Sequence, residues 1–317
     1  MEQTLDFILS FCKDKVPGHG EDNYCYSFCD EAGLLGTFDG CGGAGAKTHE
    51  KYSGHTEAFI ASRLCAGAFY DSFRAVFPNK KGVQELLEQV FVPCVQNRLA
   101  DYRPPKNENG IKISGSGIRT LPSTAAVALI RPNGDGAEIS SIWAGDSRVY
   151  LMNGSGLYQL TTDHTSEPDP MVTIYEDGIL RNVLCVDQPV RLSCNTINVR
   201  GPFIVFAATD GCFGYLSTPM EFEGVLLDTL LKSSCVAQWE NSLAEIIGSV
   251  AGDDHTLCMA SYGYGSFEAL QAQLRGRYEQ LSKDYLAPVA ALPVDDIQSR
   301  LALWGNYKTE YLKYAGK

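Results

Sequence analysis

LGTFDGCGGA, residues 35–44, constrains the architecture of this chain more than any other stretch. Residues 34–38 form an apolar and small-residue run that is typical of a buried β-strand. The pair Asp39-Gly40 is a common turn, and further glycines follow it. We therefore expect a strand that ends in a rigidly held carboxylate.

Several other carboxylates share this context, because each lies where an expected strand ends or begins. They are Glu21, Asp22, Asp146, Asp210, Asp253 and Asp254. Carboxylates at strand ends can converge on one edge of a sheet, and oxygen-only ligands suit Mg²⁺ or Mn²⁺. Without cations, the members of such a cluster repel one another and their pKa values rise. Each residue taken alone is equally consistent with an ordinary turn.

The periodicity of apolar residues predicts strands and helices in blocks. Expected strands are 23–28, 34–38, 123–130, 137–144, 148–152, 203–208 and 256–262. Expected helices are 54–77, 83–95, 220–231 and 235–250. Residues 101–119 are polar and rich in Gly and Pro, so we expect a loop there. Because strands and helices do not alternate strictly, the pattern favours an α+β layered domain over a doubly wound parallel sheet.

The chain changes character after residue 265. Apolar residues recur there every three or four positions in two sets, with Pro288 and Pro293 between them. This spacing predicts two amphipathic helices that form a hairpin. We therefore divide the chain into a main domain, 1–265, and a helical C-terminal extension, 266–317. The extension is expected to dock on the main domain or on a protein partner.

The composition is that of an acidic globular protein. The 317 residues carry a formal net charge of −12, which argues against nucleic acid or an anionic membrane surface as the main partner. No stretch reaches the roughly 18 apolar residues of a membrane span, and the first residues lack the pattern of a signal peptide. The 11 cysteines include no CxxC pair, which favours free thiols in a reducing compartment. We predict a soluble, cytoplasmic protein.

The carboxylates also carry a resemblance to a known family. Eight segments resemble, in order, motifs of the PP2C (PPM) family of metal-dependent protein serine/threonine phosphatases. They are EDN at 21–23, LGTFDGCGGA at 35–44, STAAV at 123–127, AGDSR at 144–148, LTTDHT at 160–165, RNVL at 181–184, ATDG at 208–211 and GDDHT at 252–256. Each motif alone is weak, whereas their common order across 21–256 is specific.

The resemblance implies a PP2C-like β-sandwich of two antiparallel sheets flanked by helices (αββα), here with the C-terminal helical extension. It implies a centre of two Mn²⁺ or Mg²⁺ ions, with a third accessory site. The implied metal ligands are Glu21, Asp39, the Gly40 carbonyl, Asp146, Asp210 and Asp253. Asp39, which would bridge both ions, and Asp210 are the implied catalytic residues, Asp146 belongs to the accessory site, and Thr124 would support the ligands.

The implied reaction removes phosphate from phosphoserine and phosphothreonine proteins by attack of a water that bridges the two ions. A phosphoprotein is therefore the expected substrate. Two alternatives stay open. The chain could be a catalytically weak phosphatase-like domain that binds phosphoproteins or partners, or it could hydrolyse a small phosphate ester.

The sequence departs from the family pattern at four places. Asp254 replaces the usual asparagine, which is a mild change. Cys41 stands where many members have a histidine, and it is either a small turn residue or a reactive thiol. Pro17 occupies the position of the usual phosphate-binding arginine, for which His19 or Lys15 are candidate substitutes. The flap segment 166–180 looks shortened.

A P-loop interpretation of 41–48 is set aside, because the glycines it requires are missing.

Overall fold

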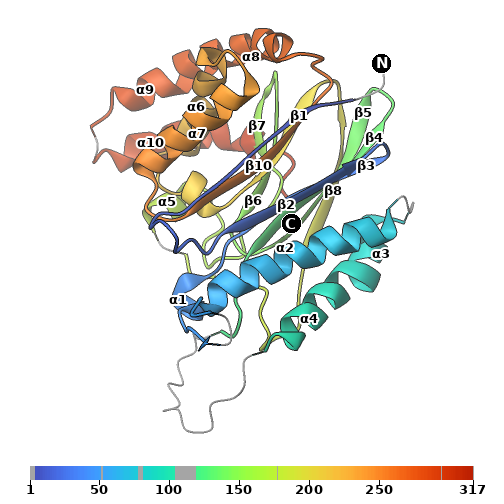
Figure 1. Ribbon diagram of the computed structural model, residues 1–317. Helices are drawn as coiled ribbons and strands as arrows, with labels where there is room; N and C mark the ends of the chain where they lie inside the picture. The colour runs from blue at the N-terminus through green and yellow to red at the C-terminus, as the bar shows by residue number, and fades with distance from the viewer. Residues whose placement is uncertain are drawn as a thin grey trace.

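Two stacked β-sheets with helices on both outer faces make up the architecture (Figure 1). This computed structural model describes residues 4–50, 53–77, 81–103, 119–176, 178–293 and 295–316. All pairs of neighbouring strands within the two sheets are antiparallel. The predicted α+β class, with its sandwich of two antiparallel sheets flanked by helices, is confirmed.

The first sheet has five strands in the order β1-β10-β9-β6-β7. Their bounds are β1 Leu5–Lys13, β10 His255–Tyr262, β9 Phe203–Ala208, β6 Arg148–Asn153 and β7 Gly156–Gln159. The apolar run predicted as a buried strand is β9, which lies at the centre of this sheet and is buried throughout. Strands β1 and β7 were not predicted.

The second sheet has the order β2-β3-β4-β5-β8. Its strands are β2 Asn23–Cys29, β3 Ala32–Phe38, β4 Ala125–Asn133, β5 Gly136–Ala144 and β8 Ser193–Arg200. The register pairs Asn23 with Phe38 and Ala125 with Ala144, so the start of β2, the end of β3, the start of β4 and the end of β5 share one edge. Strand β8, a polar edge strand, was not predicted.

Helices cover the outer face of the second sheet. They are α2 Glu57–Val76, α3 Val83–Leu86, the π-helix η2 Leu87–Phe91 and α4 Val92–Asp101. Helix α2 begins where the Thr56 hydroxyl accepts a hydrogen bond from the Phe59 amide, a standard N-terminal cap. Buried side chains of α2 and α4 pack on β3, β4 and β5 as one apolar cluster.

The other helical layer covers the first sheet and includes the C-terminal residues. Its elements are α6 Pro219–Lys232, α7 Val236–Val250, α8 Phe267–Leu281, η4 Ser282–Leu286, α9 Ala287–Ala290 and α10 Ile297–Tyr311. Side chains of α8 and α10 belong to the same buried cluster as those of β6 and β9. The helices predicted for 266–317 are confirmed and pack against the rest of the chain, while the division at residue 265 stays a prediction.

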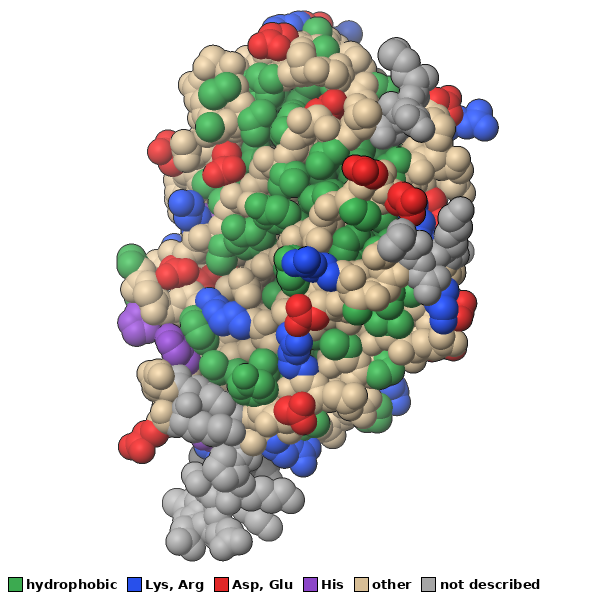
Figure 2. Space-filling model, turned by 45° about the vertical axis from the view of Figure 1, so that its right-hand side comes forward, with side chains coloured by type: hydrophobic (Ala, Val, Ile, Leu, Met, Phe, Trp, Pro, Cys, Tyr) green, Lys and Arg blue, Asp and Glu red, His purple; other side chains and the backbone are tan. Residues whose placement is uncertain are grey.

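The surface charges and the free cysteines do not identify a binding partner. Figure 2 shows acidic and basic side chains interspersed over one face, with apolar side chains between them. All 11 cysteines lie in the described ranges and are free. Among the described helices, none is long and apolar enough to cross a membrane. Most of the predicted loop at 101–119 lies outside the described residues.

Candidate functional site

The sandwich gathers the predicted carboxylates at one end, near α1 (Gly42–Gly45) and α5 (Val172–Tyr175) in Figure 1. Asp39 directly follows β3 and Asp210 follows β9 through Thr209. Asp146 lies in the turn between β5 and β6, which connects the two sheets. Asp253 lies in the loop that enters β10.

Two pairs of polar side chains tie the sheets together at this end. The Thr209 hydroxyl, which follows the first sheet, donates to Asp22 Oδ2 at 2.8 Å. The hydroxyls of Thr124 and Ser147 lie 2.7 Å apart. Thr124 also accepts a hydrogen bond from the Asp39 amide at 3.1 Å, so it holds the backbone beneath that carboxylate. Predicted as a supporting residue, Thr124 is in contact with the Asp39 backbone.

The acidic side chains influence one another strongly. Burial, and then the charges of Asp22 and Asp210, raise the pKa of Asp39 well above its usual range. Burial also raises the pKa of Asp22 to about 8 and that of Asp210 to about 6. Burial and the Asp210 charge raise the pKa of Asp146 to about 8. Four carboxyl groups are therefore close enough for each to disfavour ionisation of another.

Glu21 and Asp253 lie at the rim of this cluster. Burial raises the pKa of Glu21, and the charges of Asp254 and Asp253 add to that shift. Partial burial raises the pKa of Asp253 as well, although the residue remains exposed to solvent. The Glu21 carboxylate lies against the backbone of Gly42, where a Cβ atom would meet Oε2 at 2.2 Å. Glu21 thus adjoins the turn that Asp39 begins.

Helix α2 fixes the position of Glu21. The Thr56 hydroxyl donates to Glu21 Oε1, and the Ser62 hydroxyl donates to the Glu21 carbonyl at 2.5 Å. Arg63 reaches the same carbonyl at 3.4 Å and the Gly20 carbonyl at 3.4 Å. These contacts therefore bring a basic side chain, Arg63, to the Glu21 backbone, and the sequence motifs gave no sign of it.

Asp254 connects the loop before β10 to the loop before β2. Its Oδ1 accepts the Lys15 amide and its Oδ2 accepts the Glu21 amide, both at 2.7 Å. The Lys15 ammonium donates to the Ala251 carbonyl, so this candidate substitute for the missing arginine is engaged with backbone. Both oxygens of Asp254 thus serve as acceptors for backbone amides.

The Asp146 turn rests on a buried ion pair. Arg148 binds Asp163 in a bidentate manner, with Nε to Oδ1 at 3.0 Å and Nη2 to Oδ2 at 2.6 Å. The two side chains are only 3% and 2% exposed. His164 secures the other side of the turn, because Gly145 exchanges hydrogen bonds with the His164 amide and ring. The turn that presents Asp146 is therefore rigid.

Cys41 lies in the turn itself, where its amide donates to the Pro122 carbonyl at 3.2 Å. Burial, and then the charges of Asp39, Asp146 and Asp210, raise the pKa of its thiol well above the usual range. These acidic surroundings therefore favour the neutral thiol over the thiolate.

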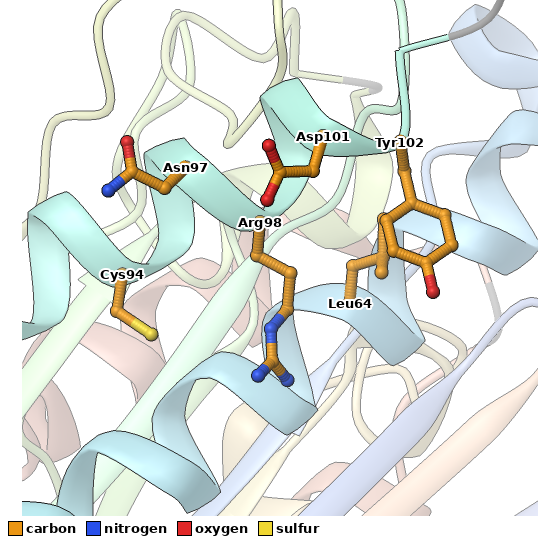
Figure 3. A pocket seen from close by; sticks show the side chains of 6 residues that line it. All are labelled: Leu64, Cys94, Asn97, Arg98, Asp101 and Tyr102. Atoms are coloured by element: carbon orange, nitrogen blue, oxygen red, sulfur yellow. The ribbon is translucent and has the colours of Figure 1, made fainter.

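A separate pocket of about 500 Å³ lies between α2 and α4 (Figure 3). Its lining residues are Leu64, Cys94, Asn97, Arg98, Asp101 and Tyr102. The Arg98 guanidinium is already bound to Asp71 at 2.6 Å. None of the residues predicted for the site lines this pocket, so it is distinct from the acidic cluster at the end of the sandwich.

Comparison with known proteins identifies solved structures that have a similar fold. No protein-family model and no curated protein sequence matches the chain. Among solved structures, the serine/threonine phosphatase Stp1 from Staphylococcus aureus is similar over 81% of this chain and 95% of its own, with 16% identity and a TM-score of 0.57. The phosphatase PstP/Ppp from Mycobacterium tuberculosis is similar over 82% and 98%, with 17% identity and a TM-score of 0.55.

The chain has the fold of the PP2C-type serine/threonine phosphatases. A further structure with this fold, the catalytic domain of the phosphatase PstP in complex with two manganese ions, is similar over 82% of this chain with a TM-score of 0.53. At 17% identity, this similarity shows the fold alone. The chemistry of this chain has to be judged from its own residues.

The residues at the open end of this PP2C fold suit a hard divalent cation. Asp146 Oδ1 is buried and has no hydrogen-bond partner among the described residues. The surrounding donors are carboxylate oxygens, which Mn²⁺ and Mg²⁺ prefer, and their mutual repulsion would be relieved by positive charge. In the described part of the chain, no three His, Cys, Asp or Glu side chains converge closely enough to hold an ion as they stand. The carboxylates lie at the same end of the sandwich, but they do not surround a single point.

Asp22 is the residue that the sequence motifs undervalue. It was grouped with the carboxylates near strand ends but is not one of the implied metal ligands. Asp22 is only 3% exposed, its charge raises the pKa of Asp39, and the charge of Asp210 raises its own pKa. Its signal in the sequence is its place next to Glu21, directly before β2.

Proposed function

We propose that this protein is a divergent PP2C-type phosphatase that hydrolyses phosphoserine and phosphothreonine in proteins with the help of Mn²⁺ or Mg²⁺. The observation that carries the proposal is the gathering of carboxylates from both sheets at one end of a PP2C fold. A scaffold without chemistry gains nothing from several buried carboxylates that raise one another's pKa.

In this proposal the predicted ligands divide between two main ion sites and one accessory site. Glu21, Asp39, the Gly40 carbonyl, Asp210 and Asp253 are proposed to hold two ions, and Asp146 an accessory one. When bound, such ions supply positive charge for phosphoryl oxygens and lower the pKa of a water molecule at the site. The protein supplies the positions: Asp254 and Thr56 orient Glu21, and Thr124 holds the Asp39 backbone.

The alternative is a phosphatase-like domain that binds phosphoproteins without turning them over. It is favoured by Cys41 and Pro17, which stand where the family has a histidine and an arginine, and by the open arrangement of the carboxylates in the described part of the chain. We propose a cytoplasmic location in either case, in keeping with the free cysteines.

One experiment separates the two functions. Hydrolysis of p-nitrophenyl phosphate and of a phosphothreonine peptide is measured with Mn²⁺, with Mg²⁺ and with a chelator. We expect metal-dependent hydrolysis of both substrates and a loss of about 10²-fold or more in Asp39→Asn. Asp101→Asn, an exposed carboxylate on α4, is the matched control and should keep full activity. Peptide binding without turnover at any metal concentration would instead establish the binding module.

A further inference from the structure

A short segment of the chain, 166–176, runs beside the Asp146 turn and includes α5. Thr173 on α5 accepts a hydrogen bond from Arg148 Nη2 at 3.3 Å, and Arg148 is the same side chain that binds Asp163 beneath the turn. Tyr175, at the end of α5, is 38% exposed and donates to the Ser217 carbonyl at 2.8 Å. The segment is therefore in contact with the buried Arg148, which supports the Asp146 turn, and we call residues 166–176 the wall.

Helix α10 is hydrogen-bonded to this wall at Asp169. Trp304 Nε1 donates to Asp169 Oδ1 at 2.9 Å, and the Lys308 ammonium binds Oδ2 at 2.5 Å. The Met171 amide also donates to Oδ1, at 2.9 Å. Both oxygens of the Asp169 carboxylate are thus occupied by α10, while its backbone belongs to the wall.

Burial by itself would raise the pKa of Asp169, but the hydrogen bonds from Lys308 and Met171 outweigh burial and hold the pKa below its usual range. The carboxylate is therefore charged at neutral pH. A charge-assisted contact of this kind is stronger than a neutral hydrogen bond.

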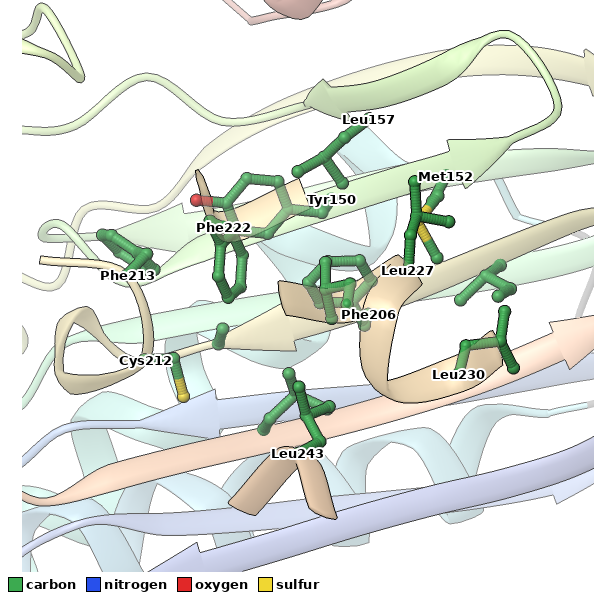
Figure 4. Close-up of a cluster of buried hydrophobic side chains, with 14 of the residues drawn as sticks. Tyr150, Met152, Leu157, Phe206, Cys212, Phe213, Phe222, Leu227, Leu230 and Leu243 are labelled. Atoms are coloured by element: carbon green, nitrogen blue, oxygen red, sulfur yellow. The ribbon is translucent and has the colours of Figure 1, made fainter. Parts of the chain in front are cut away.

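Helix α10 can serve as a fixed anchor because it is itself bound deep in the core. The Tyr307 hydroxyl donates to the buried Glu223 at 2.5 Å. The hydroxyls of Tyr311 and Tyr150 lie 3.3 Å apart, and Figure 4 shows Tyr150 within the aromatic cluster over the first sheet. Trp304, Tyr307 and Tyr311 are all nearly inaccessible to solvent.

The residues after α10 bind the stretch of chain that precedes the wall. The Gly316 amide donates to the Leu160 carbonyl at 3.0 Å, and the Thr162 hydroxyl donates to the Gly316 carbonyl. Asn195, on β8 of the second sheet, donates to the Tyr314 carbonyl at 2.7 Å. The C-terminal residues therefore fasten the stretch that leads from β7 to Asp163.

We propose that α10 positions the 166–176 wall for a phosphorylated polypeptide, with Trp304 and Lys308 as the positioning residues. In this proposal, a peptide whose phosphate binds at the carboxylate end of the sandwich extends along the wall, whereas a small aryl phosphate is too short to reach it. Loss of the contacts that Trp304 and Lys308 make with Asp169 should therefore weaken peptide binding, while every group of the acidic cluster is retained. The kinetic part of this inference rests on the proposed phosphatase function, and the structural part does not.

The structural part is tested by hydrogen exchange of the 166–176 amides in the full-length protein. Trp304→Phe removes the N–H donor but keeps an aromatic ring, and Lys308→Met removes the charge but keeps the chain length. Loss of a charge-assisted hydrogen bond is expected to speed exchange there about tenfold. Lys313→Met is the control, because the Lys313 ammonium is bound to the exposed Glu310 at 3.2 Å. Unchanged exchange in both variants overturns the proposal.

The kinetic part compares two substrates. In Trp304→Phe and Lys308→Met, we expect KM for a phosphothreonine peptide to rise by about three- to tenfold. For p-nitrophenyl phosphate, kcat should change by less than about twofold, and Lys308→Arg should restore the peptide KM. Equal losses on both substrates overturn the proposal, since a general loss of folded enzyme would produce them. If the unmodified protein lacks phosphatase activity, the proposed function fails and the exchange experiment alone decides whether α10 positions the wall.

Discussion

At the scale of single residues, Asp39 combines a proposed role as a cation ligand with burial among other carboxylates. Its pKa lies well above the usual range because the group is buried among Asp22, Asp210, Asp146 and Asp253. Ionised carboxylates in such a site oppose folding. Stability and the proposed function therefore make opposite demands on this position.

We predict that Asp39→Asn stabilises the metal-free protein while it removes activity. Asparagine keeps the shape of the side chain and removes one negative charge from the cluster. In the presence of a chelator, the melting temperature of the variant should exceed that of the unmodified protein by roughly 2–6 °C. With millimolar Mn²⁺, the order should reverse, because only the unmodified protein gains stability from the ion. A variant that is less stable under both conditions would contradict the charge-repulsion account.

The same groups predict how the stability of the chelated protein depends on pH. The pKa values of Asp22 and Asp146 are raised to about 8 and that of Asp210 to about 6, against about 4 in an unfolded chain. The folded state therefore binds more protons, and its stability falls as the pH rises from about 4 to about 8.

Thermal unfolding in the presence of a chelator, measured between pH 5 and pH 8, checks this prediction. The melting temperature should fall across that range, and saturating Mn²⁺ should remove most of the decline. The slope should also be smaller in Asp146→Asn than in the unmodified protein. A stability that rises with pH in chelator would mean that other groups dominate the titration.

The residues of the candidate site could be predicted from the sequence where a motif marked them. They were harder to predict where burial in the folded chain brings a side chain to the site. Asp39, Asp146 and Asp210 follow apolar runs, and the structure places them at one end of the sandwich, although their role as ligands stays a prediction. Asp22 was grouped with them by its place before an expected strand, but its burial was not predicted, and neither was the contact of Arg63 with the Glu21 backbone. Burial depth and a contact between helix and loop leave no mark in a short stretch of sequence.

At the scale of elements, the loops that enter β2 and β10 are joined by a single side chain, Asp254. The family pattern has asparagine there, a change that looked mild in the sequence. In the structure, however, both oxygens accept backbone amides, from Lys15 and from Glu21. An asparagine offers one acceptor oxygen and would direct its NH₂ group at an amide donor.

We therefore predict a graded loss of metal affinity in Asp254→Asn and Asp254→Ala. The asparagine variant loses one acceptor and the alanine variant loses both, at about 1–3 kcal/mol for each unpaired amide. Because Glu21 is released each time, the Mn²⁺ concentration for half-maximal activity should rise about tenfold in the first variant and further in the second. Equal behaviour of the asparagine variant and the unmodified protein would show that Asp254 does not orient the Glu21 loop.

The predicted and missed strands differ in a physical way. Strands such as β9 are buried on both faces, and their apolar runs stand out in the sequence. The missed strands β1, β7 and β8 lie at the edges of the sheets. Strand β8 alternates partly buried and exposed positions with many polar residues, and β7 has only four residues. Edge strands are specified by their neighbours more than by their own composition.

At the scale of the whole molecule, the C-terminal helices complete the layer over the first sheet. Their buried aromatic side chains, Trp304, Tyr307 and Tyr311, belong to the same cluster as Tyr150 and Phe206. The sequence predicted the two amphipathic helices but left open whether their apolar faces meet this chain or a partner. Periodicity reports that a helix has an apolar face and gives no information about what covers it.

We predict that removal of residues 296–317 lowers stability severely. Truncation exposes the aromatic cluster under α10 and leaves the buried Glu223 without the Tyr307 hydroxyl. Trp304→Ala alone should lower the free energy of unfolding by about 3–5 kcal/mol. Since whole domains are stable by only about 5–15 kcal/mol, the truncated chain should be largely unfolded or aggregated at 37 °C.

Chemical denaturation followed by intrinsic fluorescence and circular dichroism checks this expectation. Ile297→Ala, on the exposed side of the same helix, is the matched control and should change stability by less than about 1 kcal/mol. Size-exclusion chromatography separates the two roles that the sequence left open, because a helix whose apolar face binds a partner would leave a soluble, folded domain when it is removed. A truncated chain that unfolds at the same denaturant concentration as the full chain would show that α10 is not needed to cover the core.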